Sequence, residues 1–225
     1  MHIARVRLTA DNLPAQRAFY AGTLGLRVVA TEAAAFTVRA GDSLLTFAQG
    51  HAGGPYHLAF NVPRARFQEA QAWLAARAPL LTRDGADEFA FTSWAARACY
   101  CADPAGNILE CIARQTIADG AAAGPFGPAA LRCVSEIGLA VVAVPAAAAA
   151  LSAQFGLPPY GDVSATFAAL GDERGLVILA AIGRPWLPTT DARAAVAPVA
   201  VTIAGGRRGQ YRLSGYPYVI EAVAR

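Results

Sequence analysis

The chain contains no lysine, and only 16% of its 225 residues are charged. Its basic residues are therefore all arginines, and only Arg207 and Arg208 stand next to each other. The formal net charge is a small +3. Because nucleic-acid binding requires basic residues clustered on one surface, this distribution argues against a nucleic-acid partner.

Long apolar runs are also missing. Proline, glycine or a charged residue interrupts each apolar run within about 12 residues, whereas a membrane-spanning helix needs about 20. The first twelve residues alternate between apolar and polar from the start and lack the architecture of a signal peptide. We therefore expect a cytoplasmic protein with no membrane partner.

The four cysteines form no C-x-x-C pair. Cys99 and Cys101 are separated by one residue in a strand-like run, so both point to the same side of it. That spacing is too short for an ordinary disulfide and unsuited to zinc on a regular strand. We expect four reduced, buried cysteines, as is usual for a cytoplasmic protein.

What the chain has in quantity is apolar residues, which make up 55% of the sequence. A chain of this length can bury one large core or two modest ones. Residues 4–10 alternate as a strand does, and a helix follows with Asn12 as its N-cap and Pro14 in its first turn. Gly25 ends this helix, and two further strands form a hairpin that turns at residues 41–42.

The same order of elements recurs in the next sixty residues. It comprises a strand at 56–62, a helix at 64–78, a hairpin around residues 84–85 and a strand at 107–114. Residues 116–130 are rich in glycine, alanine and proline, which is typical of a boundary between modules. We predict a first module at 1–116, a linker at 117–130 and a second module at 131–225.

The second module repeats the first at a fixed offset. Aligning LGL (24–26) with FGL (155–157) gives an offset of 131, which also places Val6 on Ile137 and Leu8 on Leu139 without a gap. The last part of the chain is shorter. Segments 198–204 and 217–224 mirror 56–62 and 107–113, but the stretch between them is too short for a helix. We therefore expect the fourth unit to be truncated.

The segments NLPAQRAFYAGTLGL, YHLAFNVP and ADPAGNILECIA resemble the vicinal oxygen chelate superfamily. This superfamily includes glyoxalase I, fosfomycin-resistance thiol transferases, extradiol dioxygenases and bleomycin-resistance proteins. The resemblance is close over residues 3–114 and loose over 132–225. It implies an α+β fold in which paired βαβββ units form two curled mixed sheets with outer helices, as tandem modules in one chain.

The resemblance also implies a metal site. Carried over by position, His57 and Glu110 match two of the metal ligands of metal-using relatives. Arg5 occupies the first-strand position within the same module, and an arginine only donates hydrogen bonds and cannot coordinate a metal. In a tandem chain the equivalent position of the other module can supply this ligand, and the offset of 131 makes that residue Glu136.

Glu136 is the one charged residue in an otherwise apolar strand, where an unpaired carboxylate is costly. We therefore predict that His57, Glu110 and Glu136 bind a divalent metal, with the two glutamates as catalytic residues. Zinc, manganese, nickel and iron all suit this set of ligands. A different interpretation stays open, in which His57 is a hydrogen-bonded core histidine, the glutamates face solvent, and Glu136 pairs with Arg132 or Arg5.

The same comparison of modules predicts a second cavity, formed by the equivalent positions of the first and fourth units. A reciprocal cavity would hold Arg5, Val199 and Glu221, and we expect an Arg5–Glu221 ion pair where a metal would otherwise lie. Since Val199 takes the position at which ring-cleaving relatives have a second histidine, ring cleavage is not expected. Thiol transfer to a phosphonate is not expected either, because Arg97 is the nearest basic residue to the predicted cavity.

Asn61, Trp94 and Tyr100 are the residues predicted to line the substrate pocket, although such aromatic residues are often core residues. Two functions are compatible with these residues. One is a glyoxalase-like, metal-dependent lyase or isomerase that acts on a small oxygen-bearing substrate. The other is a metal-free protein of the bleomycin-resistance type that binds or sequesters a small molecule. In either case the chain could act as a monomer or as a homodimer.

Overall fold

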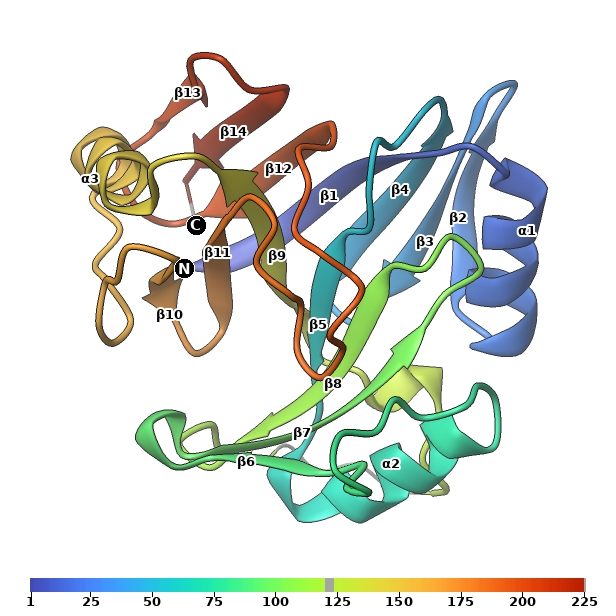
Figure 1. Cartoon of the computed structure of the whole chain (residues 1–225). Coiled ribbons are helices and arrows are strands. Elements are labelled where there is room, and N and C mark those ends of the chain that lie inside the picture. Colours follow the sequence, from blue (N-terminus) through green and yellow to red (C-terminus); the bar gives the residue numbers. More distant parts are fainter. Residues whose placement is uncertain (120–123, 225) are drawn as a thin grey trace.

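Two seven-stranded mixed sheets make up the fold (Figure 1). The computed structural model describes residues 1–119 and 124–224. Residues 120–123 of the predicted linker lie outside the described residues, and the module boundaries themselves stay a prediction.

The first sheet combines the two ends of the chain. Its strand order is β13-β14-β12-β1-β4-β3-β2. The strands are β1 (His2–Ala10), β2 (Arg27–Glu32), β3 (Ala35–Ala40), β4 (Ser43–Gln49), β12 (Val199–Ala204), β13 (Gly209–Arg212) and β14 (Tyr218–Val223).

The second sheet combines the two middle parts of the chain. Its strand order is β10-β11-β9-β5-β8-β7-β6. The strands are β5 (His57–Asn61), β6 (Phe89–Phe91), β7 (Ala96–Ala102), β8 (Ile108–Arg114), β9 (Cys133–Val141), β10 (Phe167–Asp172) and β11 (Gly175–Ala181).

Each sheet therefore joins strands from both halves of the chain. Antiparallel pairing of β1 with β12 joins the two halves of the first sheet, and antiparallel pairing of β5 with β9 joins those of the second. The predicted α+β class, with tandem modules and two mixed sheets, is confirmed. This pairing places residues of the predicted first and second modules on neighbouring strands.

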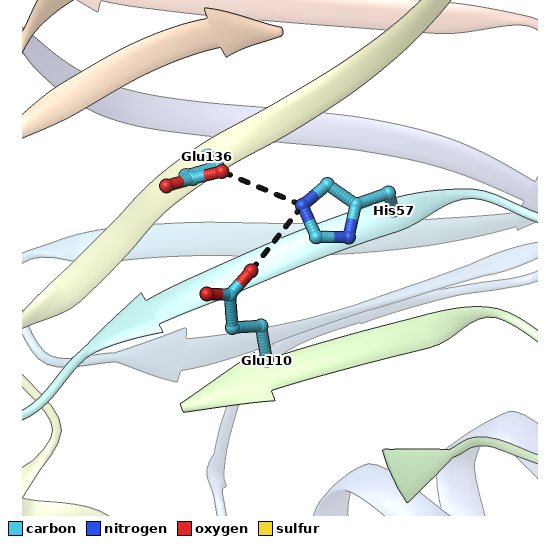
Figure 2. Close-up of side chains that lie close together, drawn as sticks. All are labelled: His57, Glu110 and Glu136. Carbon is cyan, nitrogen blue, oxygen red and sulfur yellow. Dashed lines mark hydrogen bonds and ion pairs between the residues drawn. The ribbon is translucent and has the colours of Figure 1, made fainter. Parts of the chain in front are cut away.

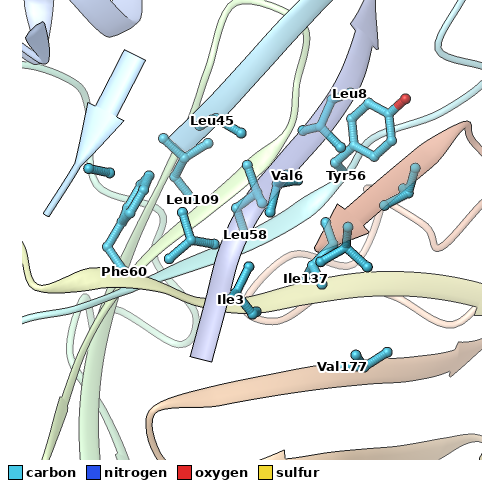
Figure 3. Packing of buried hydrophobic residues seen from close by; sticks show 14 of the residues in the cluster. Ile3, Val6, Leu8, Leu45, Tyr56, Leu58, Phe60, Leu109, Ile137 and Val177 are labelled. Carbon is cyan, nitrogen blue, oxygen red and sulfur yellow. The ribbon is translucent and has the colours of Figure 1, made fainter. Parts of the chain in front are cut away.

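The main hydrophobic core unites one face of each sheet with the helices. Strand alternation explains how β5 contributes to it: Leu58 and Phe60 point into the core, so His57, Ala59 and Asn61 point to the other face. Figure 3 shows Leu58 and Phe60 among core residues from β1, β8 and β9. A second, smaller apolar cluster, which includes Tyr100 and Trp186, lies on the opposite face of the second sheet.

Three α-helices and four helical segments of other types complete the described fold. They are α1 (Leu13–Arg17), π-helical η1 (Ala18–Thr23), η2 (Arg64–Arg66), α2 (Phe67–Ala75), η3 (Thr92–Trp94), η4 (Pro128–Ala130) and α3 (Val144–Phe155). The Asn12 side chain accepts a hydrogen bond from the Ala15 amide, so the predicted N-cap is confirmed. Gly25 follows the helix with φ +72°, a conformation that glycine adopts readily.

One predicted hairpin is smaller than expected. At residues 84–85 the chain turns within a single bridge between Arg83 and Ala86, while the longer β6–β7 hairpin turns later, at 92–95. Asp84 and Gly85 both have positive φ, so the tight turn itself forms where the sequence indicates. The sequence does not show where β6 begins, because that strand is only three residues long.

The last unit is truncated as predicted: in the described chain, only a short turn separates β12 from β13. The register corrects one assignment. Ala59 pairs with Glu110 in the second sheet, and Thr202 pairs with Glu221 in the first, so the counterpart of His57, two residues earlier, is Ala200. Val199 instead points into the core.

No helix in the described residues is both long and apolar enough to cross a membrane. The four cysteines are free and buried, as the sequence predicts.

Candidate metal centre

Three side chains that are far apart in the sequence converge on one point of the second sheet (Figure 2). His57 Nε2 lies 3.4 Å from Glu136 Oε2 and 3.5 Å from Glu110 Oε2. One potential ligand atom from each of the three residues lies within 4.8 Å of the others. Figure 2 shows both carboxylates pointing toward the same ring nitrogen.

Strand register explains this convergence. Ala59 on β5 pairs with Glu136 on β9 on one side and with Glu110 on β8 on the other. Paired residues point to the same face, and His57 lies on this face as well because it is two residues from Ala59. The methyl side chain of Ala59 leaves the space between the two longer carboxylates open.

The donor atoms match the size of a divalent metal ion. Ligands bound tetrahedrally at roughly 2.1 Å from an ion lie about 3.4 Å from one another. The two distances from His57 Nε2 have this length already. One imidazole and two carboxylates are hard-to-borderline donors that suit zinc, manganese, iron or nickel. The residues therefore fit a divalent ion, and their role as ligands is a prediction.

The site is almost closed to solvent. His57 is 6% exposed, Glu110 4% and Glu136 3%. Burial raises the pKa of Glu110 well above its usual range, and the nearby charge of Glu136 raises it further, while Arg114 lowers it. Without a metal ion, the protonated form of Glu110 is therefore favoured more than in an exposed glutamate. Tyr100, opposite Glu110 on β7, has its pKa raised by burial and by the charge of Glu110.

Arg114 is a member of the site that was not predicted from the sequence. Its Nη2 donates to Glu136 Oε1, and the side chain is only 1% exposed. Its guanidinium also lies 5.5 Å from the Trp94 ring and 5.7 Å from the Tyr160 ring, both cation–π distances. The signal was present in NILECIAR, since residues 110 and 114 share one face of a strand.

If His57 were a core histidine and no metal bound, Glu136 was expected to pair with Arg132 or Arg5, but neither arginine lies beside it. Arg132 lies 3.7 Å from Asp119, and Arg5 lies in the other sheet. Glu136 therefore pairs with Arg114 and contacts His57.

Trp186 closes one side of the site. Its ring stacks on the His57 imidazole, with 5.2 Å between centroids and 21° between the planes. Gly138 on β9 makes this packing possible, because a Cβ there would lie 2.7 Å from a Trp186 ring carbon. The His57 Nδ1 and Trp186 Nε1 atoms are buried and have no hydrogen-bond partner among the described residues.

A cavity of about 260 Å³ opens onto the three converging side chains. Trp94 and Tyr100 line it, and their role in binding a substrate stays a prediction. Asn61 does not line this cavity: it lines a different one, and its side chain donates to the Glu173 carbonyl. Asn61 shares the face of His57, but four residues of strand place it about 13 Å further along.

Residues 182–198, which connect β11 with β12, supply part of the cavity wall that was not predicted from the sequence. Arg184, Trp186 and Leu187 from this segment line the cavity. In Figure 1 the segment, drawn in orange, extends toward β5 and β8. Its sequence shows no periodicity, so only the folded path reveals that it reaches the site.

The reciprocal cavity in the first sheet is built on the same plan. Thr202 pairs with Arg5 on one side and with Glu221 on the other, as Ala59 does with the two glutamates. Both charged residues line a cavity with Ala200, but among the ion pairs of the described chain Arg5 and Glu221 form none. The expected ion pair is wrong, because both side chains are exposed to water and Thr202 stands between them, donating to Glu221.

Arg97, the basic residue predicted to lie nearest the cavity, points elsewhere. Its Nε donates to Glu88 at 2.7 Å, and its guanidinium lies 4.7 Å from the Phe67 ring. It is therefore not available to bind an anion at the site.

Comparisons with known proteins establish the fold. A structure from Bacillus subtilis described as a "putative dioxygenase" is 17% identical, with a TM-score of 0.62 over 99% of this chain and 84% of that one. A glyoxalase I variant from Zea mays is 13% identical, with a TM-score of 0.55 over 99% of this chain and 92% of that one. No family model and no curated protein matches the sequence.

Proposed function

We propose that this chain, which has the fold of the vicinal oxygen chelate superfamily in two tandem modules, is a glyoxalase-like, metal-dependent lyase or isomerase. The observation that carries the proposal is the convergence of one imidazole and two carboxylates at metal-ligand spacing on a cavity wall. A buried pair of carboxylates is costly unless a cation compensates it. The substrate would be a small, oxygen-bearing organic molecule, with no membrane or nucleic acid involved, in the cytoplasm.

Each residue has a distinct task in this proposal. His57, Glu110 and Glu136 would hold a divalent ion, which supplies Lewis-acid polarisation of a substrate carbonyl or enolate oxygen. Trp186 fixes the imidazole plane by stacking and helps to exclude water from it. Trp94 and Tyr100 would enclose the apolar part of the substrate.

The two glutamates are not equivalent as proton acceptors. Arg114 holds Glu136 through a buried ion pair, so Glu136 is fixed in place. Glu110 forms no ion pair with an arginine in the described structure, so it is the carboxylate that would be free to detach from the ion and accept a proton. We therefore assign the role of general base to Glu110 and a purely ligating role to Glu136.

A second function is favoured by the same ion pair. Arg114 already neutralises one of the two carboxylates, and a protonated Glu110 would remove the other charge. The cavity would then be stable without a metal ion and would bind a small molecule among its aromatic side chains. This corresponds to a metal-free binding or sequestering protein.

Metal analysis separates the two functions. The protein is stripped with a chelator, reloaded with zinc, manganese, nickel or iron in turn, and desalted, and the bound metal is then quantified. The enzyme proposal predicts one ion per chain and its loss in His57→Ala. His51→Ala is the matched control, because His51 is exposed and its ring pairs with Asp11 away from the three predicted ligands.

The outcomes point in opposite directions. Equal metal content in the wild type and His57→Ala would contradict the predicted ligand set. A folded wild-type protein that takes up none of the four metals would instead support the binding function.

A further inference from the structure

Arg184 brings a positive charge to the wall of the metal-site cavity. It lies on the segment 182–198, whose backbone is held in place by several hydrogen bonds within it. The Ala194 amide donates to the Arg184 carbonyl, and the Trp186 amide donates to the Ala192 carbonyl. Both Arg184 and Trp186 line the cavity. The charge is therefore carried by an ordered part of the wall.

The Arg184 guanidinium has no anionic partner in the described chain. None of the ion pairs includes it, and none of the side-chain hydrogen bonds does, whereas Arg97 and Arg114 each pair with a glutamate. Its guanidinium lies 4.8 Å from the Phe167 ring, a residue that also lines the cavity. Burial disfavours its charged form and lowers the pKa of Arg184. An anion in the cavity would restore the lost stabilisation.

The charge balance of the site favours the same conclusion. With a divalent ion bound, the ion, Arg114 and Arg184 bring four positive charges, and Glu110 and Glu136 bring two negative ones. A formal excess of two positive charges is unfavourable beside side chains as deeply buried as Arg114 and the three predicted ligands. A neutral substrate leaves this excess in place, whereas a negatively charged substrate reduces it.

We propose that the substrate carries a carboxylate that binds Arg184, at the end away from the oxygen atoms that face the metal ligands. This inference rests on the proposed function, since it takes the metal site as the other anchor. A planar guanidinium matches a carboxylate through two parallel hydrogen bonds. A sphere with the volume of the cavity is about 8 Å across, which suits a single ring or a short chain.

The experiment compares two ligands that differ only in this charge. Protocatechuate has two neighbouring hydroxyls that can chelate a metal and one carboxylate at the far side of its ring, and its methyl ester lacks the negative charge. Both are titrated calorimetrically into zinc-loaded wild-type protein, Arg184→Gln and Arg193→Gln. Arg193 is the matched control, since it lies on the same segment but is exposed and donates to the Gly183 carbonyl.

We expect the wild type to bind the acid at least roughly tenfold more tightly than the ester, as one charge-assisted contact provides. This preference should persist in Arg193→Gln and disappear in Arg184→Gln, with the zinc content of all three proteins unchanged. The same preference in Arg184→Gln as in the wild type would overturn the inference while leaving the metal site intact.

Failure of the metal site is a separate result. If the wild type retains none of zinc, manganese, nickel and iron, the proposed function is wrong, and the titration is read on the metal-free proteins. A wild type that retains one of the other three metals instead of zinc is titrated loaded with that metal. A preference for the acid that Arg184→Gln alone abolishes would still support carboxylate binding by Arg184, and equal binding of acid and ester by the wild type would overturn it.

Discussion

The buried pair between Arg114 and Glu136 yields the sharpest stability prediction. Replacing Arg114 by methionine keeps most of the side-chain length and removes the charge. Glu110 and Glu136 are then two buried carboxylates without the cation that now compensates them. Breaking a buried pair by removing one partner costs about 3–5 kcal/mol, which is a large part of the 5–15 kcal/mol by which domains are typically stable.

Chemical denaturation of the chelator-treated protein measures this loss. The expected 3–5 kcal/mol corresponds to a decrease of roughly 10–15 °C in the melting temperature of a chain of this size. The double variant Arg114→Met/Glu136→Gln should recover most of the loss, because it leaves no unpaired charge behind. Arg97→Met is the matched control, since Arg97 pairs with Glu88 at the partly exposed surface and should change stability by less than about 1 kcal/mol.

Adding metal refines the test. A divalent ion supplies the missing positive charge, so saturating zinc should stabilise Arg114→Met more than it stabilises the wild type. Metal-free Arg114→Met that is as stable as the wild type would contradict this prediction, because Glu136 would then not depend on its buried partner.

Three further predictions concern other buried groups. Asp103 accepts hydrogen bonds from Tyr20 and from its own loop, so Asp103→Ala should lower the free energy of unfolding by about 2–4 kcal/mol, and a loss below 1 kcal/mol would count against this role. The raised pKa of Glu110 means that the folded, metal-free protein holds this proton more tightly than the unfolded chain. Protonation of Glu110 therefore stabilises the fold at acid pH, and this stabilisation is lost as the pH rises through the folded pKa. Denaturation at several pH values should show a smaller loss of stability with rising pH in Glu110→Gln than in the wild type. An equal loss in both proteins would contradict this prediction. Burial raises the pKa of Cys101 to about 12 and that of Cys133 to about 11, so a thiol-specific disulfide reagent should label the four cysteines only after denaturation, and rapid labelling of the native protein would be inconsistent with their burial.

The repeat in the sequence, together with the resemblance to the vicinal oxygen chelate superfamily, was sufficient to bring Glu136 together with His57. A repeat with an offset of 131 places Glu136 at the start of the third unit, and pairing between the second and third units is what the fold requires. Alternation along the strands then decides which side chains share a face. The repeat and the alternation are read directly from the sequence, whereas the pairing of the units comes from the resemblance.

Register and loop paths were harder to predict. The counterpart of His57 in the fourth unit is Ala200, whereas the sequence led to Val199. The prediction failed because the sequence does not show which residues pair across β12 and β14. Trp186 and Arg184 reach the site on a segment without regular structure, and nothing in its sequence indicates its direction. Arg114 could have been predicted from the sequence, since it is four residues from Glu110 on one strand and therefore shares its face.

Anomalous diffraction from crystals of the zinc-loaded protein, recorded on both sides of the zinc absorption edge, tests the metal site most directly. We expect one peak per chain, about 2.0–2.2 Å from His57 Nε2 and from one carboxylate oxygen each of Glu110 and Glu136. A peak bound elsewhere on the chain, or no peak at this cluster with Arg114 still paired to Glu136, would contradict it.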